Sequence, residues 1–164
     1  MKTIYLAGGC FWGMQKFFDQ FDGVIHTMVG YANGPEEAPT YQEVCRNSGH
    51  AETIRIDYDP KIITLATILN YFFMVIDPLS VNQQGEDHGI QYRTGIYYPE
   101  KEQLSEIEEI YRAEEKKAGM NLAVELLPLE NFFPAEEYHQ KYLEKNPGGY
   151  CHIPGRFFDL GKNK

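Results

Sequence analysis

Short apolar runs alternate along the chain with segments whose apolar positions recur at helical spacing. Residues 2–7 predict a strand, and the glycines at 8–9 allow a tight turn directly after it. In residues 11–21 the apolar side chains recur every three or four positions, which predicts a helix with one buried face that stops by Gly23. Cys10 therefore lies at or near the N-terminus of this helix.

The rest of the chain predicts further elements of both kinds, without repeats or low-complexity linkers. Strand patterns occupy residues 24–34, 51–58, 90–98 and 122–129. Helical patterns occupy residues 99–119, 134–146 and 64–76, the last with Thr64 as N-cap. Loops are expected at 79–89, at 147–155 and at 35–50, the last with one helical turn near Tyr41. Strands and helices mix without regular βαβα alternation, so we expect one α+β domain over residues 1–164.

Composition narrows the classes of function. With 164 residues, 43% of them apolar, the chain is long enough to bury a core and is not typical of a disordered protein. Its net charge of −9 disfavours a nucleic-acid partner, because no basic stripe is available for phosphates. No apolar run reaches membrane-spanning length, and the N-terminal apolar stretch is too short for a secretory signal. We expect a cytoplasmic protein with no membrane partner, and a monomer.

The chain has three cysteines, Cys10, Cys45 and Cys151. A secreted disulfide scaffold usually has more cysteines and an even number of them. In a reducing compartment, a disulfide among them is expected to be transient and catalytic. A helix N-terminus stabilises a thiolate, so the position of Cys10 predicts a lowered pKa. The alternative is an inert, buried cysteine that fills a tight turn. The residues around Cys10 alone leave both interpretations open.

Five motifs, in order and covering most of the chain, resemble those of the A-type peptide-methionine (S)-S-oxide reductases. The first is "GCFWG", which places Cys10 beside two aromatic rings. The five segments are "GCFWG" at 9–13, "TYQEVC" at 40–45, "GHAE" at 49–52, "QGEDHGIQYR" at 84–93 and "NPGGYC" at 146–151.

The resemblance implies a nucleophile, a methyl pocket and an acid. Cys10 corresponds to the thiolate that attacks the sulfoxide sulfur, while Phe11 and Trp12 correspond to the pocket for the S-methyl group. Glu52 corresponds to the acid that protonates the oxygen. A carboxylic acid donates a proton at neutral pH only if burial or a like charge raises its pKa above about 4.3. Without the resemblance, Glu52 reads as an exposed residue at the start of a strand; beside Ala51 and ahead of an alternating strand, it could be buried.

The remaining motifs imply oxygen ligands and a second thiol. Tyr41 and Tyr92 correspond to the tyrosines that hydrogen-bond the sulfoxide oxygen or its water, and Asp87 to a residue that helps to hold the substrate. Cys151 corresponds to the thiol that condenses with a sulfenic acid on Cys10 to form a disulfide. The proline and glycines before Cys151 suggest a mobile approach.

By this resemblance the protein reduces the S epimer of methionine sulfoxide, free or in peptides. Thioredoxin or a similar dithiol then reduces the Cys10–Cys151 disulfide, and neither a bound cofactor nor a metal is implied. The expected fold is a ferredoxin-like, two-layer mixed sheet with helices packed on it and a long irregular C-terminal segment.

The sequence departs from the family pattern in two places. Gln15 stands where many members have glutamate, which leaves the tuning of Cys10 open. The C-terminal tail has no third recycling cysteine, so a two-cysteine cycle is expected, with Cys45 as the rival partner for Cys10.

Three other functions compete with the reductase. The "HAE" of residues 50–52 matches half of a zinc deaminase signature, although no closely spaced cysteine pair completes it. A thiol hydrolase would pair Cys10 with His50, His88 or His139. A binding module with an aromatic pocket would need no reaction of the thiol. The structural alternative for His50 and His88 is that they orient loops by side-chain hydrogen bonds.

Overall fold

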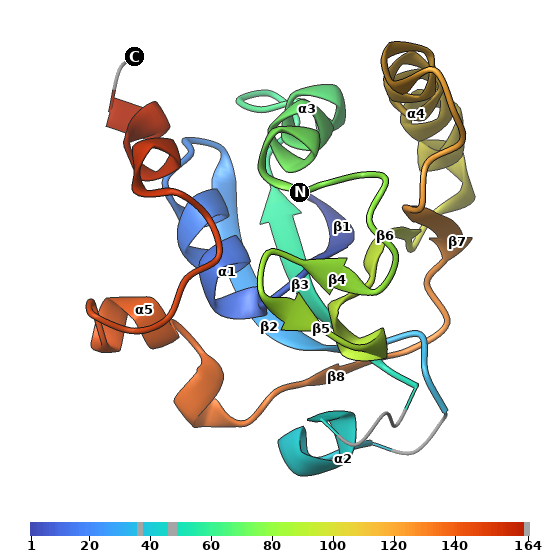
Figure 1. The fold of residues 1–164 in the computed structure, drawn as a ribbon. Coiled ribbons are helices and arrows are strands. Elements are labelled where there is room, and N and C mark those ends of the chain that lie inside the picture. Colours follow the sequence, from blue (N-terminus) through green and yellow to red (C-terminus); the bar gives the residue numbers. More distant parts are fainter. Residues whose placement is uncertain (36–37, 46–48, 163–164) are drawn as a thin grey trace.

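A computed structural model of the chain describes residues 1–35, 38–45 and 49–162. Its centre is a six-stranded mixed sheet with the strand order β7-β6-β1-β3-β2-β8, and a separate two-stranded sheet is formed by β4 and β5 (Figure 1). The strands are β1 (Lys2–Gly8), β2 (Val24–Ala32), β3 (Ala51–Tyr58), β4 (Gln83–Gln84), β5 (Asp87–His88), β6 (Thr94–Tyr98), β7 (Glu125–Pro128) and β8 (Phe132–Pro134).

Most neighbouring strands of the large sheet are antiparallel, and the pair β6–β7 is parallel. Three helices lie in the connections between its inner strands: one joins β1 to β2, a short one lies between β2 and β3, and one joins β3 to the β4–β5 hairpin that precedes β6. The helices are α1 (Phe11–Asp19), α2 (Tyr41–Cys45), α3 (Leu65–Val75), α4 (Leu104–Ala118) and α5 (Tyr142–Lys145). Short 3-10 helices lie at η1 (Ile90–Tyr92), η2 (Lys101–Gln103), η3 (Glu137–His139) and η4 (Gly155–Lys162).

The main core lies between one face of the sheet and α1, α3 and α4. The strands contribute alternate aliphatic residues, because successive side chains of a strand point to opposite faces. The helices add an aromatic layer in which Phe17, Phe18 and Phe72 are fully buried. The buried aliphatic strand residues of this face are Ile4, Leu6, Ile54, Ile56 and Ile96, and Tyr58 at the end of β3 extends it.

Several predicted elements are confirmed. The strand, glycine turn and helix at the N-terminus are present, and Cys10 is the N-cap residue of α1. Thr64 caps α3, with its side chain accepting a hydrogen bond from the Thr67 N–H. The helix α4 ends at Gly119 in the left-handed conformation, as a helix-terminating glycine should.

Other predictions are wrong at their boundaries. The expected strand 90–98 begins with the 3-10 turn η1, so Tyr92 lies on a turn and only 94–98 joins the sheet. The expected helix 134–146 is broken because Lys141 has a positive φ of 56°, which no helix continues through. The apolar pattern did not reveal β8, and α1 ends at Asp19, before Gly23.

The loops between these elements carry short structures. In the expected loop 35–50 the helical turn at Tyr41 is present as α2, while residues 36–37 and 46–48 lie outside the described residues. The expected loop 79–89 contains the β4–β5 hairpin. Figure 1 shows the C-terminal segment passing beside α1, where α5 and η4 both contact that helix. Within the described residues, no helix has the length and apolar character needed to cross a bilayer.

Candidate active site

The turn between β1 and α1 places Cys10 in a tightly packed position. Gly9 has a φ of +86°, and a Cβ atom there would lie 2.8 Å from the Cβ of Gln84, so both the backbone and the space require glycine. The Cys10 side chain is only 6% exposed. Gly9 therefore lets β4 pack against the turn directly before the thiol.

Glu52 lies on the helix-covered face of the sheet and is 1% exposed, which confirms the expected burial. It pairs with Tyr31 of β2 and shares its face with Ile54, two residues further along β3. The Phe11 backbone N–H donates to its Oε1 at 3.2 Å, while its Oε2 is buried with no hydrogen-bond partner among the described residues. Burial raises the pKa of Glu52 to about 8, so the carboxyl group holds a proton at neutral pH.

The predicted lowering of the Cys10 pKa is wrong. Burial raises the pKa of this thiol well above its usual range, and the carboxyl groups of Glu52 and Asp87 raise it further. A hydrogen bond from the Trp12 backbone N–H, the helix-terminus contribution, lowers it by less than burial raises it. Cys10 is therefore a thiol at neutral pH, because burial destabilises the thiolate more than the helix N-terminus stabilises it.

Both predicted tyrosines face the same buried region. Burial and the charge of Glu52 raise the pKa of Tyr41, and burial followed by the charges of Glu52 and Cys10 raises that of Tyr92. Both phenols are consequently neutral hydrogen-bond donors across the physiological range. Because the charge of Glu52 acts on both phenols, the two tyrosines lie near the acid.

Asp87 lies on β5, beside the start of α1. Its carboxylate accepts hydrogen bonds from the backbone N–H of Cys10 and from the hydroxyl of Tyr150, and its Oδ2 is buried without a partner in the part of the chain described. Burial raises the pKa of Asp87, which is the first cause of its shift. The residue thus holds the Cys10 turn and presents a free oxygen to the same region.

Phe11 and Trp12 provide neighbouring aromatic surface at the start of α1, and both rings lie against His139. Phe11 is buried in a small cluster with Val29 and Tyr31 of β2. The indole of Trp12 stacks on Tyr142, with ring centroids 3.8 Å apart, and its Nε1–H donates to His139 Nδ1 at 3.0 Å. Two contacts therefore fix the orientation of the indole, as a wall of a binding pocket requires.

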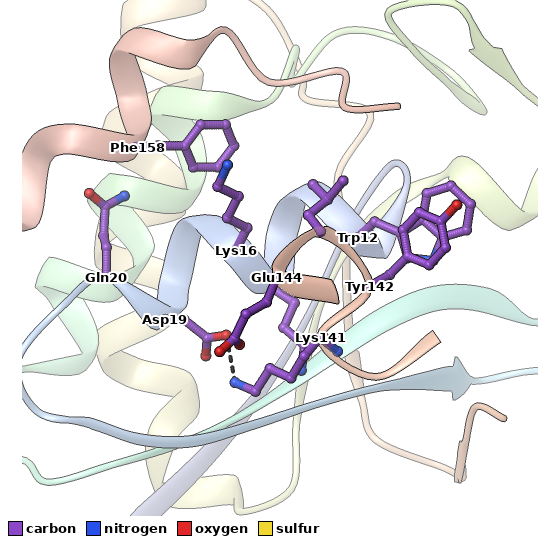
Figure 2. A pocket seen from close by; sticks show the side chains of 10 residues that line it. Trp12, Lys16, Asp19, Gln20, Lys141, Tyr142, Glu144 and Phe158 are labelled. Carbon is purple, nitrogen blue, oxygen red and sulfur yellow. Dashed lines mark hydrogen bonds and ion pairs between the residues drawn. The ribbon is translucent and has the colours of Figure 1, made fainter. Parts of the chain in front are cut away.

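A pocket of about 280 Å³ lies beside this indole, between α1, α5 and η4 (Figure 2). Figure 2 shows Tyr142 over Trp12 at one end and Phe158 with the Lys16 ammonium group over its ring at the other. Cys10 does not line it. Of the predicted site residues, Trp12 alone is among those that line this pocket, and none of the lining residues is a cysteine.

Cys151 is the second thiol of the site, and all three cysteines are free. Its charge raises the pKa of Cys10, and its Sγ lies 2.9 Å from the position that a Cβ of Gly13 would take. The expected mobile approach is instead a docked segment, whose contacts are described below. Cys45 is exposed and lies one helical turn after Tyr41 on α2, where its side chain hydrogen-bonds the Tyr41 hydroxyl.

The rival chemistries find little support in the positions of the histidines. His50 is buried edge-on against Phe133, and His88 is exposed. His139 accepts a hydrogen bond from the indole N–H of Trp12 through its Nδ1. Among the described residues there is no group of three potential metal ligands, so the zinc half-signature at 50–52 is not completed in space.

The departure at Gln15 is explained by its neighbours. The buried side chain accepts from the Lys141 N–H at 2.7 Å and donates to the carbonyl and hydroxyl oxygens of Thr27 at 3.3 and 3.2 Å. Gln15 therefore ties α1 to β2 and to the residue whose positive φ interrupts the C-terminal helix. A carboxylate could accept the first bond but could not donate the other two.

Replacing Gln15 by leucine is expected to destabilise the fold by about 2 kcal/mol, because buried polar groups of Thr27 and Lys141 lose their partner. Urea unfolding measures the difference. The matched control is Gln42→Leu at an exposed position, where we expect a change within about 0.5 kcal/mol. An equal effect of both substitutions would contradict this role of Gln15.

Two residues that pack beside the site, Tyr150 and His152, were not identified from the sequence, and His139 was considered only as a partner for Cys10 in a thiol hydrolase. With 12 tyrosines in the chain, no pattern distinguishes Tyr150 from a packing residue. His139 reaches Trp12 across 127 positions, a contact that only the fold creates. The adjacency of Tyr150 and His152 to Cys151 was the one signal available.

Comparisons with known proteins agree with this geometry. The family described as peptide methionine sulfoxide reductase matches residues 2–159. A peptide methionine sulfoxide reductase MsrA from Lachnoclostridium phytofermentans is 54% identical over 163 residues, which cover 99% of this chain and 98% of the relative.

Solved structures of Mxr1 from Saccharomyces cerevisiae are also similar. The reduced form has a TM-score of 0.89 at 38% identity, covering 93% of this chain and 91% of that chain. Mxr1 in complex with Trx2 has a TM-score of 0.61 at 28% identity, covering 86% and 84%. Because the family match spans nearly the whole chain and agrees with the buried thiol, acid and tyrosines, the chain belongs to the A-type peptide methionine sulfoxide reductases and is a methionine sulfoxide-reducing enzyme.

Proposed function

We propose that the protein reduces methionine sulfoxide of S configuration at sulfur, with Cys10 as nucleophile and Glu52 as acid. One observation carries this assignment: a thiol and a protonated, fully buried carboxyl group lie in one site, with the Phe11 N–H held by the carboxyl. A sulfoxide needs both groups, since its sulfur is electrophilic but its oxygen leaves only when protonated.

In the first step Glu52 transfers its proton to the sulfoxide oxygen while the Cys10 sulfur attacks the sulfoxide sulfur. Oxygen then passes to Cys10, the sulfur–oxygen bond of the substrate breaks, and methionine leaves. The proton lost by the Cys10 thiol replaces the one that Glu52 gave. The sum is one sulfoxide and one thiol giving one sulfide and one sulfenic acid, so the sulfoxide is reduced and Cys10 is oxidised.

The neighbouring side chains have supporting roles in this proposal. The hydroxyls of Tyr41 and Tyr92 donate to the sulfoxide oxygen, and both remain protonated because their pKa values are raised. Asp87 binds the substrate through its unpartnered oxygen. Phe11 and Trp12 form the apolar pocket for the S-methyl group, which is consistent with the fixed orientation of the indole.

In the second step Cys151 condenses with the sulfenic acid on Cys10 to give a disulfide. We propose that thioredoxin or a similar dithiol reduces this bond by exchange, and the complex of the related Mxr1 with Trx2 supports that choice. No bound cofactor is needed, since the electrons come from the two thiols. We also propose that the enzyme is a cytoplasmic monomer, in keeping with its three free cysteines.

The fold proposal is a single domain over residues 1–164 with a ferredoxin-like core. The order β1-α1-β2-β3-α3-β6, with the strands arranged β6-β1-β3-β2, supports it. The family match over residues 2–159 supports one reductase domain.

The deciding experiment is a stereospecific assay with thiol counting after one turnover. We expect the S epimer to be reduced with the loss of two thiols, and the R epimer to react at least about 100-fold more slowly. Equal rates for the two epimers would reject the assignment. Hydrolysis of an ester or amide without reductant would instead favour a thiol hydrolase, and ligand retention at a constant thiol count would favour a binding module.

Replacing Cys151 by serine is expected to leave about one turnover per enzyme when thioredoxin is the donor, because the sulfenic acid on Cys10 has no partner thiol. Product is measured against enzyme concentration. The matched control is Cys45→Ser, whose thiol is exposed and which should turn over repeatedly. Multiple turnover by Cys151→Ser together with a single turnover by Cys45→Ser would assign the second thiol to Cys45.

A further inference from the structure

The segment that carries Cys151 is attached to the site by the residues on both sides of the thiol. Before it, the Tyr150 hydroxyl donates to Asp87. After it, Ile153 is 3% exposed and belongs to the main core. Between these two anchors, the thiol is half-buried and close to the Ile153 carbonyl, with 3.5 Å between Sγ and the oxygen. The reduced enzyme thus holds its second thiol in place before any sulfenic acid forms.

His152 makes the most specific of these attachments. Its Nε2 lies 3.0 Å from the Gly8 carbonyl oxygen, and because a carbonyl only accepts, Nε2 carries the proton. In the part of the chain that the structure describes, Nδ1 has no hydrogen-bond partner, so the bond to Gly8 orients the ring. The ring lies against the glycine turn before Cys10: a Cβ on Gly9 would be 3.1 Å from Nε2.

Gly13 supplies the space into which this segment fits. A Cβ at this position would lie 2.9 Å from the Cys151 Sγ and 3.5 Å from the His152 Cε1. Positions three apart on a helix share a face, so Gly13 lies one turn beyond Cys10 on the side where Cys151 docks. The missing side chain brings the second thiol onto the helix turn that begins at the nucleophile.

We propose that His152 is a positioning residue that holds Cys151 beside Cys10 through its hydrogen bond to Gly8. The missing side chain of Gly13 leaves the space in which Cys151 lies. This inference rests on the proposed function. The step it serves is the condensation: the Cys151 sulfur bonds to the Cys10 sulfur as the Cys10 sulfur–oxygen bond breaks. The departing hydroxide takes the Cys151 proton and leaves as water, with Cys151 oxidised and the sulfenic sulfur reduced.

Four variants separate this role from a general structural one. His152→Leu removes the donor to Gly8 with a side chain of similar bulk, and His152→Gln restores an N–H donor. Gly13→Ala places a methyl group against the Cys151 sulfur, although alanine suits a helix better than glycine by about 1 kcal/mol. The matched control is Gly155→Ala, where no atom lies within 4 Å of the added Cβ.

The experiment mixes each reduced protein with N-acetyl-methionine amide S-oxide of S configuration, without thioredoxin. Sulfide release and loss of the first thiol report the first step, while loss of the second thiol and capture of sulfenic acid by dimedone report the condensation. We expect unchanged sulfide release in all variants. Loss of the second thiol should slow by about fivefold or more in His152→Leu, the factor for one lost hydrogen bond. It should also slow in Gly13→Ala, where the added methyl group displaces the Cys151 sulfur, and sulfenic acid should be captured in both variants. His152→Gln should be partly restored, and Gly155→Ala should match wild type.

Three results would overturn the proposal: wild-type loss of the second thiol in both His152→Leu and Gly13→Ala, equal slowing of both steps, or no recovery in His152→Gln. Failure of the proposed function is recognised separately. In that case the wild-type protein would release no sulfide, or Cys10→Ser would release it as fast as wild type.

Discussion

Cys10→Ser is expected to lower sulfoxide reduction by about 10⁴-fold or more, to the rate of the reaction without enzyme. A serine hydroxyl is a far weaker nucleophile than sulfur and cannot accept the oxygen as a sulfenic acid. The substitution changes one atom in a side chain that is 6% exposed, so the packing of the turn should persist. Sulfide release from the S epimer under single-turnover conditions measures the loss.

The control for this variant is Cys45→Ser. Cys45 has the same chemical group but is exposed and outside the proposed catalytic set. It should retain the wild-type rate of sulfide release. If Cys10→Ser still reduced the sulfoxide within tenfold of wild type, the nucleophile would have to be another residue, and the proposed mechanism would be wrong.

Glu52→Gln is expected to slow sulfide release by about 10²–10⁴-fold, the usual contribution of a positioned acid. Glutamine keeps the size of the side chain and still accepts the Phe11 N–H, but it has no acidic proton. In wild type the rate should fall as the pH rises through about 8, where Glu52 loses its proton. Glu52→Gln should lose that decline. A wild-type rate that rises through the same range would contradict the role of acid.

The same pKa shift predicts that the stability of the fold also declines as the pH rises. The folded pKa of about 8 lies above the model-peptide value, so the folded state binds the proton more tightly than the unfolded chain. Stability is then fully present below about pH 4.5 and declines as the pH rises to about 8. The stability of Glu52→Gln relative to wild type should therefore be greater at pH 8 than at pH 4.5. Urea midpoints at the two pH values test this, and an unchanged difference would contradict the burial argument.

Much of the site could be predicted from local pattern. The glycine turn and the apolar spacing after Cys10 placed the thiol at a helix start, and the structure confirms it. The alternation in residues 51–58 made burial of Glu52 conceivable, and the strand register confirms it. Both predictions depend on backbone periodicity over a few residues, which a sequence displays directly.

The pKa of Cys10 was predicted with the wrong sign for a physical reason. The helix terminus is a local feature and was visible in the sequence, whereas burial depends on the β4–β5 hairpin and residues 150–153, which close over the turn from far along the chain. Burial and two carboxyl groups then outweigh the helix end. The raised pKa of Glu52 has the same cause, because desolvation is a property of the assembled site.

The sequence by itself determined the α+β class, the reactive residue types and their order in five motifs. Only the tertiary structure decided the protonation states, the orientation of Trp12 and the docking of Cys151 against Gly13. The division follows from the range of the interactions involved. Helix and strand patterns arise between near neighbours. Burial and thiol proximity arise between residues far apart in the chain, such as Phe11 and Glu52, or Gly8 and His152.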